Sequence, residues 1–173
     1  MKNITFILSF IFILLLLSCN TNNKEIKMQE VAVFENYTVE LPLKANQVKK
    51  NRWKIEYSSL TLTTIIATEF TQIISLNNCF NIAFDKNDSA EFKLHFNSKE
   101  EIDKPAFKIY INNYKGKAGA SSFASTINFT CLILDELNTQ KRFIFEINSL
   151  GTGHDRIVES IVNSFRKNIK LLE

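Results

Sequence analysis

The sequence predicts an α+β fold, a two-layer sandwich in which a mostly antiparallel sheet of about five strands is covered on one face by two helices. Segments of alternating apolar and polar residues, which are typical of half-buried strands, follow one another through the middle of the chain. Two other segments carry apolar residues at three- and four-residue steps, which indicates amphipathic helices. The fifteen phenylalanines agree with a sheet-rich interior, because aromatic side chains suit a pleated surface.

The first residues of the sequence predict a cleavable export signal. One basic residue, Lys2, precedes an apolar run over residues 4–17, which is too short to span a bilayer comfortably, since a spanning helix needs about 20 residues. The run ends in Leu16-Leu17-Ser18-Cys19, which resembles the lipobox of bacterial lipoproteins. The resemblance implies cleavage between Ser18 and Cys19, with lipid on the Cys19 thiol and new amino group. The alternative is an ordinary signal that leaves Cys19 as a chance thiol.

The remaining chain divides into a tether and one domain. Residues 1–18 form the predicted signal peptide, and the polar, aperiodic residues 19–30 form a flexible lipidated tether. Residues 31–173 fit a single domain. That domain begins with a short buried strand at 31–34 and an extended segment at 37–43, which Pro42 ends or places at an edge.

Residues 44–54 form a basic, irregular segment that we interpret as a loop. Its cations could contact anionic headgroups, at about 1 kcal/mol each. The alternative is a solvated loop. The residues concerned are Lys44, Lys49, Lys50, Arg52 and Lys54.

The first predicted helix spans residues 58–77, although its threonines have poor helix propensity. Strands are predicted at 79–84, 91–97 and 107–111, separated by a turn at 85–89 and a charged loop at 98–104. A mobile loop follows at 112–120. The apolar face of the helix predicted over residues 58–77 consists of Leu62, Ile65, Ile66, Phe70, Ile73 and Ile74.

A long β-hairpin is predicted from residues 122–134 and 141–148, with its turn at 135–140. A final helix follows residues 151–153, where Thr152 and Asp155 have the spacing of a capping box. Its apolar stripe consists of Val158, Ile161, Val162, Phe165, Ile169 and Leu172.

The sequence offers no candidate catalytic, metal or cofactor site. His95 and His154 lie far apart without partners at metal-ligand spacing, and we interpret both as solvated. Residues 85–96 fail as a calcium loop, because Ala90 replaces the required glycine and Phe96 the twelfth-position carboxylate. Residues 116–121 lack the phosphate-loop pattern. We therefore predict a non-enzyme with no cofactor other than the lipid on Cys19. The scattered net charge of +3 argues against nucleic acid as a partner.

Two cysteines remain beyond Cys19. An exported protein meets oxidising conditions in many bacteria, so Cys79 and Cys131 could form a disulfide. The alternative is two separate buried thiols, because burial alone accounts for many cysteines.

Three segments of the domain resemble small envelope lipoproteins: residues 31–36 (VAVFEN), 90–94 (AEFKL) and 130–135 (TCLILD). The similar groups are the lipopolysaccharide-assembly lipoprotein, the auxiliary lipoprotein of ABC-type lipid transporters and the YajG-like lipoproteins. The resemblance implies a non-catalytic adaptor that is held at a membrane by its lipid and docks on an envelope protein.

Two departures concern the subfamily: residues 20–23 are polar where the assembly lipoproteins are aromatic-rich, and residues 40–57 form a longer segment. Asn20, rather than aspartate, after the lipid cysteine favours the periplasmic face of the outer membrane by the same resemblance. A Gram-positive source would place the protein on the outer face of the plasma membrane. Two other functions stay open: a lipid- or peptide-binding lipoprotein with an internal apolar pocket, and a hydrolase.

Overall fold

The computed structural model describes residues 26–34, 37–58, 61–70, 74–87, 92–118, 125–137, 139, 141–151 and 155–171. The predictions for the signal peptide, for Ser18 and Cys19, for Thr152 and for His154 lie outside these residues. β1 begins at Met28, ahead of the domain start predicted at residue 31. Within the described ranges, no helix has the length and apolar character needed to cross a membrane.

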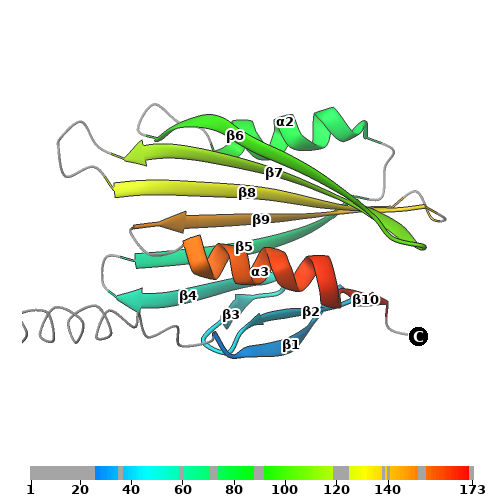
Figure 1. Ribbon diagram of the computed structural model, residues 1–173, viewed down its shortest axis with the longest axis horizontal. Helices are drawn as coiled ribbons and strands as arrows, with labels where there is room; N and C mark the ends of the chain where they lie inside the picture. The colour runs from blue at the N-terminus through cyan, green and yellow to red at the C-terminus, as the bar shows by residue number, and fades with distance from the viewer. Residues whose placement is uncertain are drawn as a thin grey trace, which may run out of the picture.

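The centre of the molecule is an antiparallel sheet of seven strands, in the order β3-β4-β5-β9-β8-β7-β6 (Figure 1). The sheet is therefore larger than the five strands predicted. Its members are β3 (Asn46–Lys49), β4 (Arg52–Ser58), β5 (Thr61–Phe70), β6 (Phe92–Asp103), β7 (Phe107–Ala118), β8 (Ser125–Glu136) and β9 (Arg142–Leu150).

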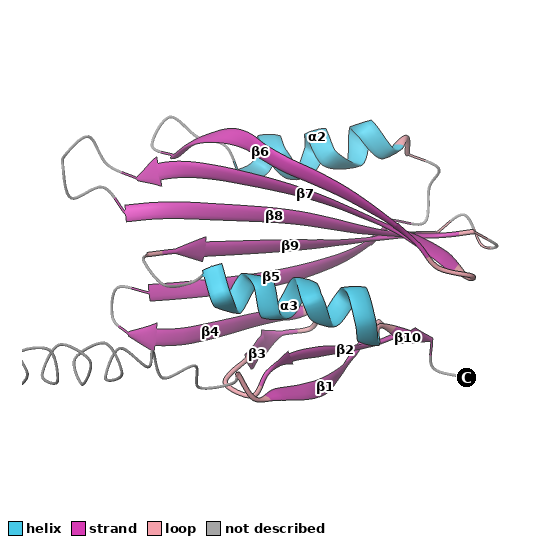
Figure 2. Ribbon diagram, viewed as in Figure 1, coloured by secondary structure: helices cyan, strands magenta, loops and turns pink. Residues whose placement is uncertain are grey.

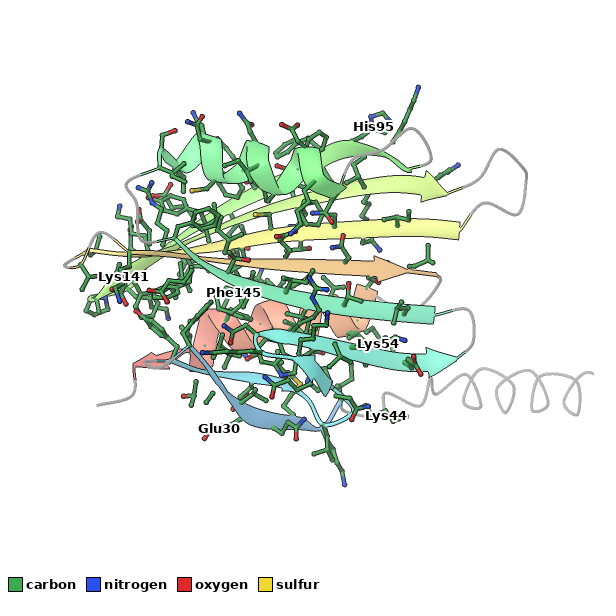
Figure 3. All side chains as sticks on the ribbon, turned by 180° about the vertical axis from the view of Figure 1, so that it is seen from behind. Glu30, Lys44, Lys54, His95, Lys141 and Phe145 are labelled. Carbon is green, nitrogen blue, oxygen red and sulfur yellow. The ribbon has the colours of Figure 1, made fainter. Side chains whose placement is uncertain are left out.

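A three-stranded sheet and two helices pack around this centre. The small sheet has the order β1-β2-β10, with β1 at Met28–Val33, β2 at Tyr37–Pro42 and β10 at Lys170–Leu171. Helix α3 (Asp155–Asn168) and the small sheet cover one face of the large sheet, and helix α2 (Leu76–Asn87) covers the other (Figures 2 and 3). The prediction that both helices share one face was therefore wrong.

Two apolar clusters, one on each face, explain this arrangement. In β8, Phe129, Cys131 and Ile133 belong to the cluster under α2, whereas Leu132 and Leu134 belong to the cluster under α3. Because successive strand residues point to opposite faces, β8 is apolar on both and needs a cover on both.

The α3 side confirms the predicted hairpin and final helix. β8 and β9 pair in register, and Phe143, Phe145 and Ile147 of β9 share the α3 face as predicted. Of the predicted helix stripe, Val158, Ile161, Val162 and Phe165 lie on α3 and are buried in the same cluster. The helix ends at Asn168, so Ile169, which is buried in that cluster as well, follows it, and Leu172 lies outside the described residues.

Within the predicted helix over residues 58–77, residues 61–70 instead form strand β5, which pairs with β4 on one side and β9 on the other, and residues 76–77 begin helix α2. The adjacent residues Ile65 and Ile66 point to opposite faces of the sheet, so their helix-like spacing was misleading. The β-branched threonines of this segment suit a strand.

The predicted strand at 79–84 is instead part of helix α2. The side chain of Ser75 accepts a hydrogen bond from the Asn78 backbone N–H, as expected of an N-cap residue. Cys79, Phe80 and Ala83 are buried on one side of the helix, whereas Ile82 is 47% exposed. The alternation of Phe80, Ile82 and Phe84 therefore does not describe a strand face.

Three predicted loops are strands. Residues 98–103 continue β6 and residues 112–118 continue β7, because the two strands pair along almost their whole length. Residues 46–49 and 52–54, within the predicted basic loop, form β3 and the start of β4. Their turn contains Asn51, whose positive φ of 56° is a conformation that asparagine tolerates well.

Candidate functional site

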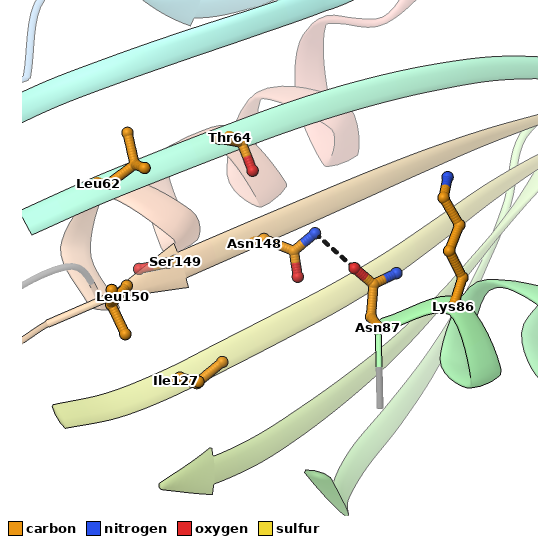
Figure 4. Close-up of a pocket in the computed structure, with 8 residues that line it drawn as sticks. All are labelled: Leu62, Thr64, Lys86, Asn87, Ile127, Asn148, Ser149 and Leu150. Atoms are coloured by element: carbon orange, nitrogen blue, oxygen red, sulfur yellow. Dashed lines mark hydrogen bonds between the residues drawn. The ribbon is translucent and has the colours of Figure 1, made fainter. Parts of the chain in front are cut away.

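A surface groove lies beside the C-terminal end of α2, over β5, β9 and β8 (Figure 4). Its volume is about 400 Å³, within the range of about 300–1,000 Å³ that ligand pockets occupy. We call it the α2 groove and define it by its lining residues, which are Leu62, Thr64, Lys86, Asn87, Ile127, Asn148, Ser149 and Leu150.

The strand register builds the floor of the α2 groove. Leu150 of β9 lies opposite Leu62 of β5 on one side and opposite Ile127 of β8 on the other. These three half-buried side chains form an apolar row across three strands. Beside this row, Thr64 lies opposite Asn148 and adds a hydroxyl and an amide. The floor therefore combines an apolar strip with hydrogen-bonding groups.

A hydrogen-bond network forms the wall of the groove and fixes α2 to the sheet. The buried Glu146 carboxylate accepts hydrogen bonds from Lys86 Nζ at 2.9 Å and from Asn87 Nδ2 at 2.8 Å. Asn87 Oδ1 accepts one from Asn148 Nδ2 at 2.9 Å (Figure 4). A buried carboxylate is tolerated only when it is paired in this way, so the network holds the end of α2 over β9.

Cys79 on α2 and Cys131 on β8 beneath it are both free, buried thiols. Burial raises the pKa of the Cys131 thiol, and Glu146, which lies opposite it on β9, raises that pKa further. Burial likewise raises the pKa of Cys79. Since the thiolate is the nucleophile, both cysteines are poor nucleophiles in this position.

No metal-binding group of three His, Cys, Asp or Glu side chains occurs in the described part of the chain. The groove offers the amides of Asn87 and Asn148, the Thr64 hydroxyl and the Lys86 ammonium group, which is paired with the buried Glu146 carboxylate. Such groups are suited to binding a partner or ligand by contact and hydrogen bonding.

The basic residues predicted to contact headgroups lie on the β3–β4 hairpin and just before it. Lys49 lies opposite Arg52, and Lys54 forms an ion pair with Glu56. Lys44, which precedes β3, is exposed, as are Lys49, Lys50 and Arg52. Figure 3 shows Lys44 and Lys54 on the same side of the molecule. The hairpin thus collects the cations at one edge of the large sheet, where contact with headgroups stays a prediction.

Sequence reasoning missed the α2 groove, because residues 58–77 were assigned to a helix and residues 79–84 to a strand. The signal that could have revealed it is the density of threonines over residues 61–71, which favours a strand. His95, labelled in Figure 3, lies on β6, is exposed as predicted and does not line the groove.

The described residues form an α+β fold built around a large antiparallel sheet with a helix on each face. No protein-family model matches the sequence, and no curated protein shows significant similarity to it.

Solved structures nevertheless share this fold. The Ran-binding protein Mog1p of Saccharomyces cerevisiae matches with a TM-score of 0.57 and 9% identity, over 86% of this chain and 97% of Mog1p. Cyanobacterial PsbP of Synechocystis matches with a TM-score of 0.54 and 12% identity, over 87% of this chain and 96% of PsbP. At these identities the likeness concerns the fold.

Proposed function

We propose that this chain is a membrane-anchored lipoprotein that serves as a non-catalytic adaptor in cell-envelope transport or assembly. The α2 groove carries the proposal, because it presents an apolar row flanked by hydrogen-bonding groups, a surface suited to contact with a partner segment. The lipobox-like segment ending at Cys19 supplies the anchor. Mog1p, a structure of the same fold, is described as Ran-binding, which agrees with a domain that binds a protein partner.

The occupant of the groove is proposed to be a segment of an envelope protein. Leu62, Ile127 and Leu150 provide an apolar strip for side chains, and Thr64 and Asn148 provide hydrogen bonds that fix its position. A lipid or peptide ligand is the second candidate, favoured by the same apolar strip. It would lie in an open groove, because large side chains such as Trp53, Phe129 and Phe145 fill the interior of the domain.

Site-specific photo-crosslinking in the native membrane tests the adaptor proposal. A photoreactive residue at Thr64 should yield a discrete adduct with one envelope protein. The matched control is Thr68, which lies on the same face of β5, is also half-buried, and does not line the groove. Equal labelling from both positions, or no protein adduct from Thr64, would contradict the proposal, and an adduct with lipid or a short peptide would favour the second candidate.

The anchor is tested separately. The purified protein should carry a mass increase on an N-terminal Cys19, and Cys19→Ala should abolish both that increase and retention in the membrane. Unchanged membrane retention of Cys19→Ala would contradict lipid anchoring. Because this measurement does not involve the groove, the anchor and the adaptor role can fail independently.

A further inference from the structure

Four basic or titratable side chains form a ladder at one end of β6 and β7. The register places Lys93 opposite Lys117 and His95 opposite Lys115. Directly opposed residues have their Cβ atoms about 4.5–5.5 Å apart, and like charges in such pairs are destabilising. All four side chains are exposed, and they point away from Leu94 and Tyr114, which belong to the cluster under α2. We call this set the basic ladder.

The two strands approach each other closely at this end. A Cβ atom added at Gly116, which lies between Lys115 and Lys117, would stand 2.6 Å from the Lys93 carbonyl oxygen. Only glycine fits that distance, so the backbone itself brings the lysines of β7 close to those of β6.

No described residue forms an ion pair with the three lysines of the ladder. Asp155 and Glu159, at the start of α3, line a neighbouring pocket that also includes Lys115. Asp155 already accepts a hydrogen bond from Asn128 Nδ2 at 2.8 Å. The ladder therefore retains positive charge that an anion would stabilise.

Two adjoining pockets surround this charge. The first, of about 540 Å³, is lined by the whole basic ladder and Thr126. The second, of about 300 Å³, is the pocket that Asp155 and Glu159 of α3 line. The sheet contributes the amides of Asn113 and Asn128 and the hydroxyl of Thr130 to it. Lys115 and Asn97 belong to both pockets, so one ligand could reach from the cationic to the amide-lined part.

The second pocket contains a buried hydrogen-bond acceptor that is unsatisfied. Asn128 is only 8% exposed, and its Oδ1 has no hydrogen-bond partner among the described residues. Its amide cannot turn round to relieve this, because the Asp155 carboxylate accepts hydrogen bonds and requires the Nδ2 donor to face it. An unsatisfied buried acceptor is destabilising, and a ligand hydroxyl would satisfy it.

We propose that this double pocket binds a phosphorylated saccharide. The basic ladder holds the phosphate, and a sugar hydroxyl donates a hydrogen bond to Asn128 Oδ1. A free phosphate would occupy only the cationic part, and an unphosphorylated sugar only the amide-lined part. The site lies away from the α2 groove and does not depend on the lipid at Cys19.

Calorimetric titration of the full protein in a neutral detergent tests this site. The probes are glucose 6-phosphate, glucose and inorganic phosphate. Glucose 6-phosphate should bind at least tenfold more tightly than the other two, and its affinity should fall as salt is raised, since salt screens exposed charges. Equal binding of glucose 6-phosphate and inorganic phosphate, or no binding of the former at millimolar concentration, would overturn the proposal.

Variants locate the site, and mixed micelles identify the source of the headgroup. The double change Lys115→Gln and Lys117→Gln on β7 should weaken glucose 6-phosphate binding at least tenfold, whereas Lys99→Gln, an exposed control on the adjacent edge strand β6, should not. Wild-type affinity in the double variant would refute the assignment. If the natural ligand is lipid-borne, micelles containing phosphatidylinositol should compete with glucose 6-phosphate, and micelles containing phosphatidylglycerol should not. Competition by neither would assign the site to a soluble sugar phosphate, and equal competition by both would refute saccharide recognition.

Discussion

The attachment of α2 to the sheet can be tested through the pair formed by Lys86 and Glu146. The Glu146 side chain is 6% exposed and that of Lys86 is 54% exposed, so the carboxylate is buried and the ammonium group is partly solvated. We consider Lys86→Met, which keeps most of the aliphatic length, Glu146→Gln, which removes the buried charge, and the double variant.

The difference in exposure between the two side chains determines how much each substitution should lower the free energy of unfolding. Lys86→Met leaves a buried carboxylate with only the hydrogen bond from Asn87 Nδ2, at 2.8 Å. Loss of a partner from a buried charge costs about 1–3 kcal/mol of stability. Because water screens the partly exposed Lys86, we expect Lys86→Met to cost about 1–2 kcal/mol. Glu146→Gln keeps an acceptor for Asn87 and frees Lys86 to enter solvent, so it should cost about 1 kcal/mol or less.

Urea unfolding of the chain expressed from residue 20 onward measures these costs as changes in midpoint at constant m-value. The double variant should be about as stable as Glu146→Gln alone, because Lys86 stabilises the fold mainly through that carboxylate. The reasoning would be refuted if the two single costs added within about 0.3 kcal/mol, since additivity indicates independent sites.

Three further outcomes are expected. Tyr37→Phe should lower the free energy of unfolding by about 1 kcal/mol, because the buried Tyr37 hydroxyl donates a hydrogen bond to the Glu136 carboxylate. The midpoint of urea unfolding measures this change. Burial raises the pKa of Cys131 and of Cys79 above the unfolded value, so the folded state binds more protons at alkaline pH. The free energy of unfolding should therefore fall above pH ~8.5, and less so in Cys131→Ala, while both thiols should react with iodoacetamide much faster in urea than in the native state. Phe145→Ala should cost about 3–5 kcal/mol, because the ring is buried with its centroid 4.6 Å from that of Phe165, whereas the exposed Lys99→Ala should stay within about 0.5 kcal/mol by thermal or urea unfolding.

Elements with a single consistent period could be predicted from the sequence. In α3 the stripe from Val158 to Phe165 follows the helical period, and in β9 Phe143, Phe145 and Ile147 alternate. Tertiary pairing decided the elements with mixed signals. Ile65 and Ile66 fit a helix locally, but hydrogen bonding to both β4 and β9 makes that segment a strand.

The α2 groove and the basic ladder could not be predicted, since both depend on which strands become neighbours. Leu62 and Leu150 are distant in sequence and meet only because β5 pairs with β9. Lys93 lies in a predicted strand, but it meets Lys117 only because β7 continues through residues 112–118, for which a loop is predicted, and pairs there with β6. No local sequence pattern predicts which residues of the two strands are paired, although Gly116 marks the place where the two strands come close.

The position of the α2 groove follows from how the apolar surface is divided between the two faces. The run from Cys131 to Leu134 has no polar residue, so β8 is apolar on both faces and each requires a cover. On one face, α3 and the small sheet cover the apolar residues of the strands from β4 to β7. On the other, α2 ends at Asn87, beyond which Leu62, Ile127 and Leu150 remain only half-buried. An apolar row that the protein's own helix leaves uncovered, beside amides held by a buried carboxylate, is where a partner segment would complete the packing.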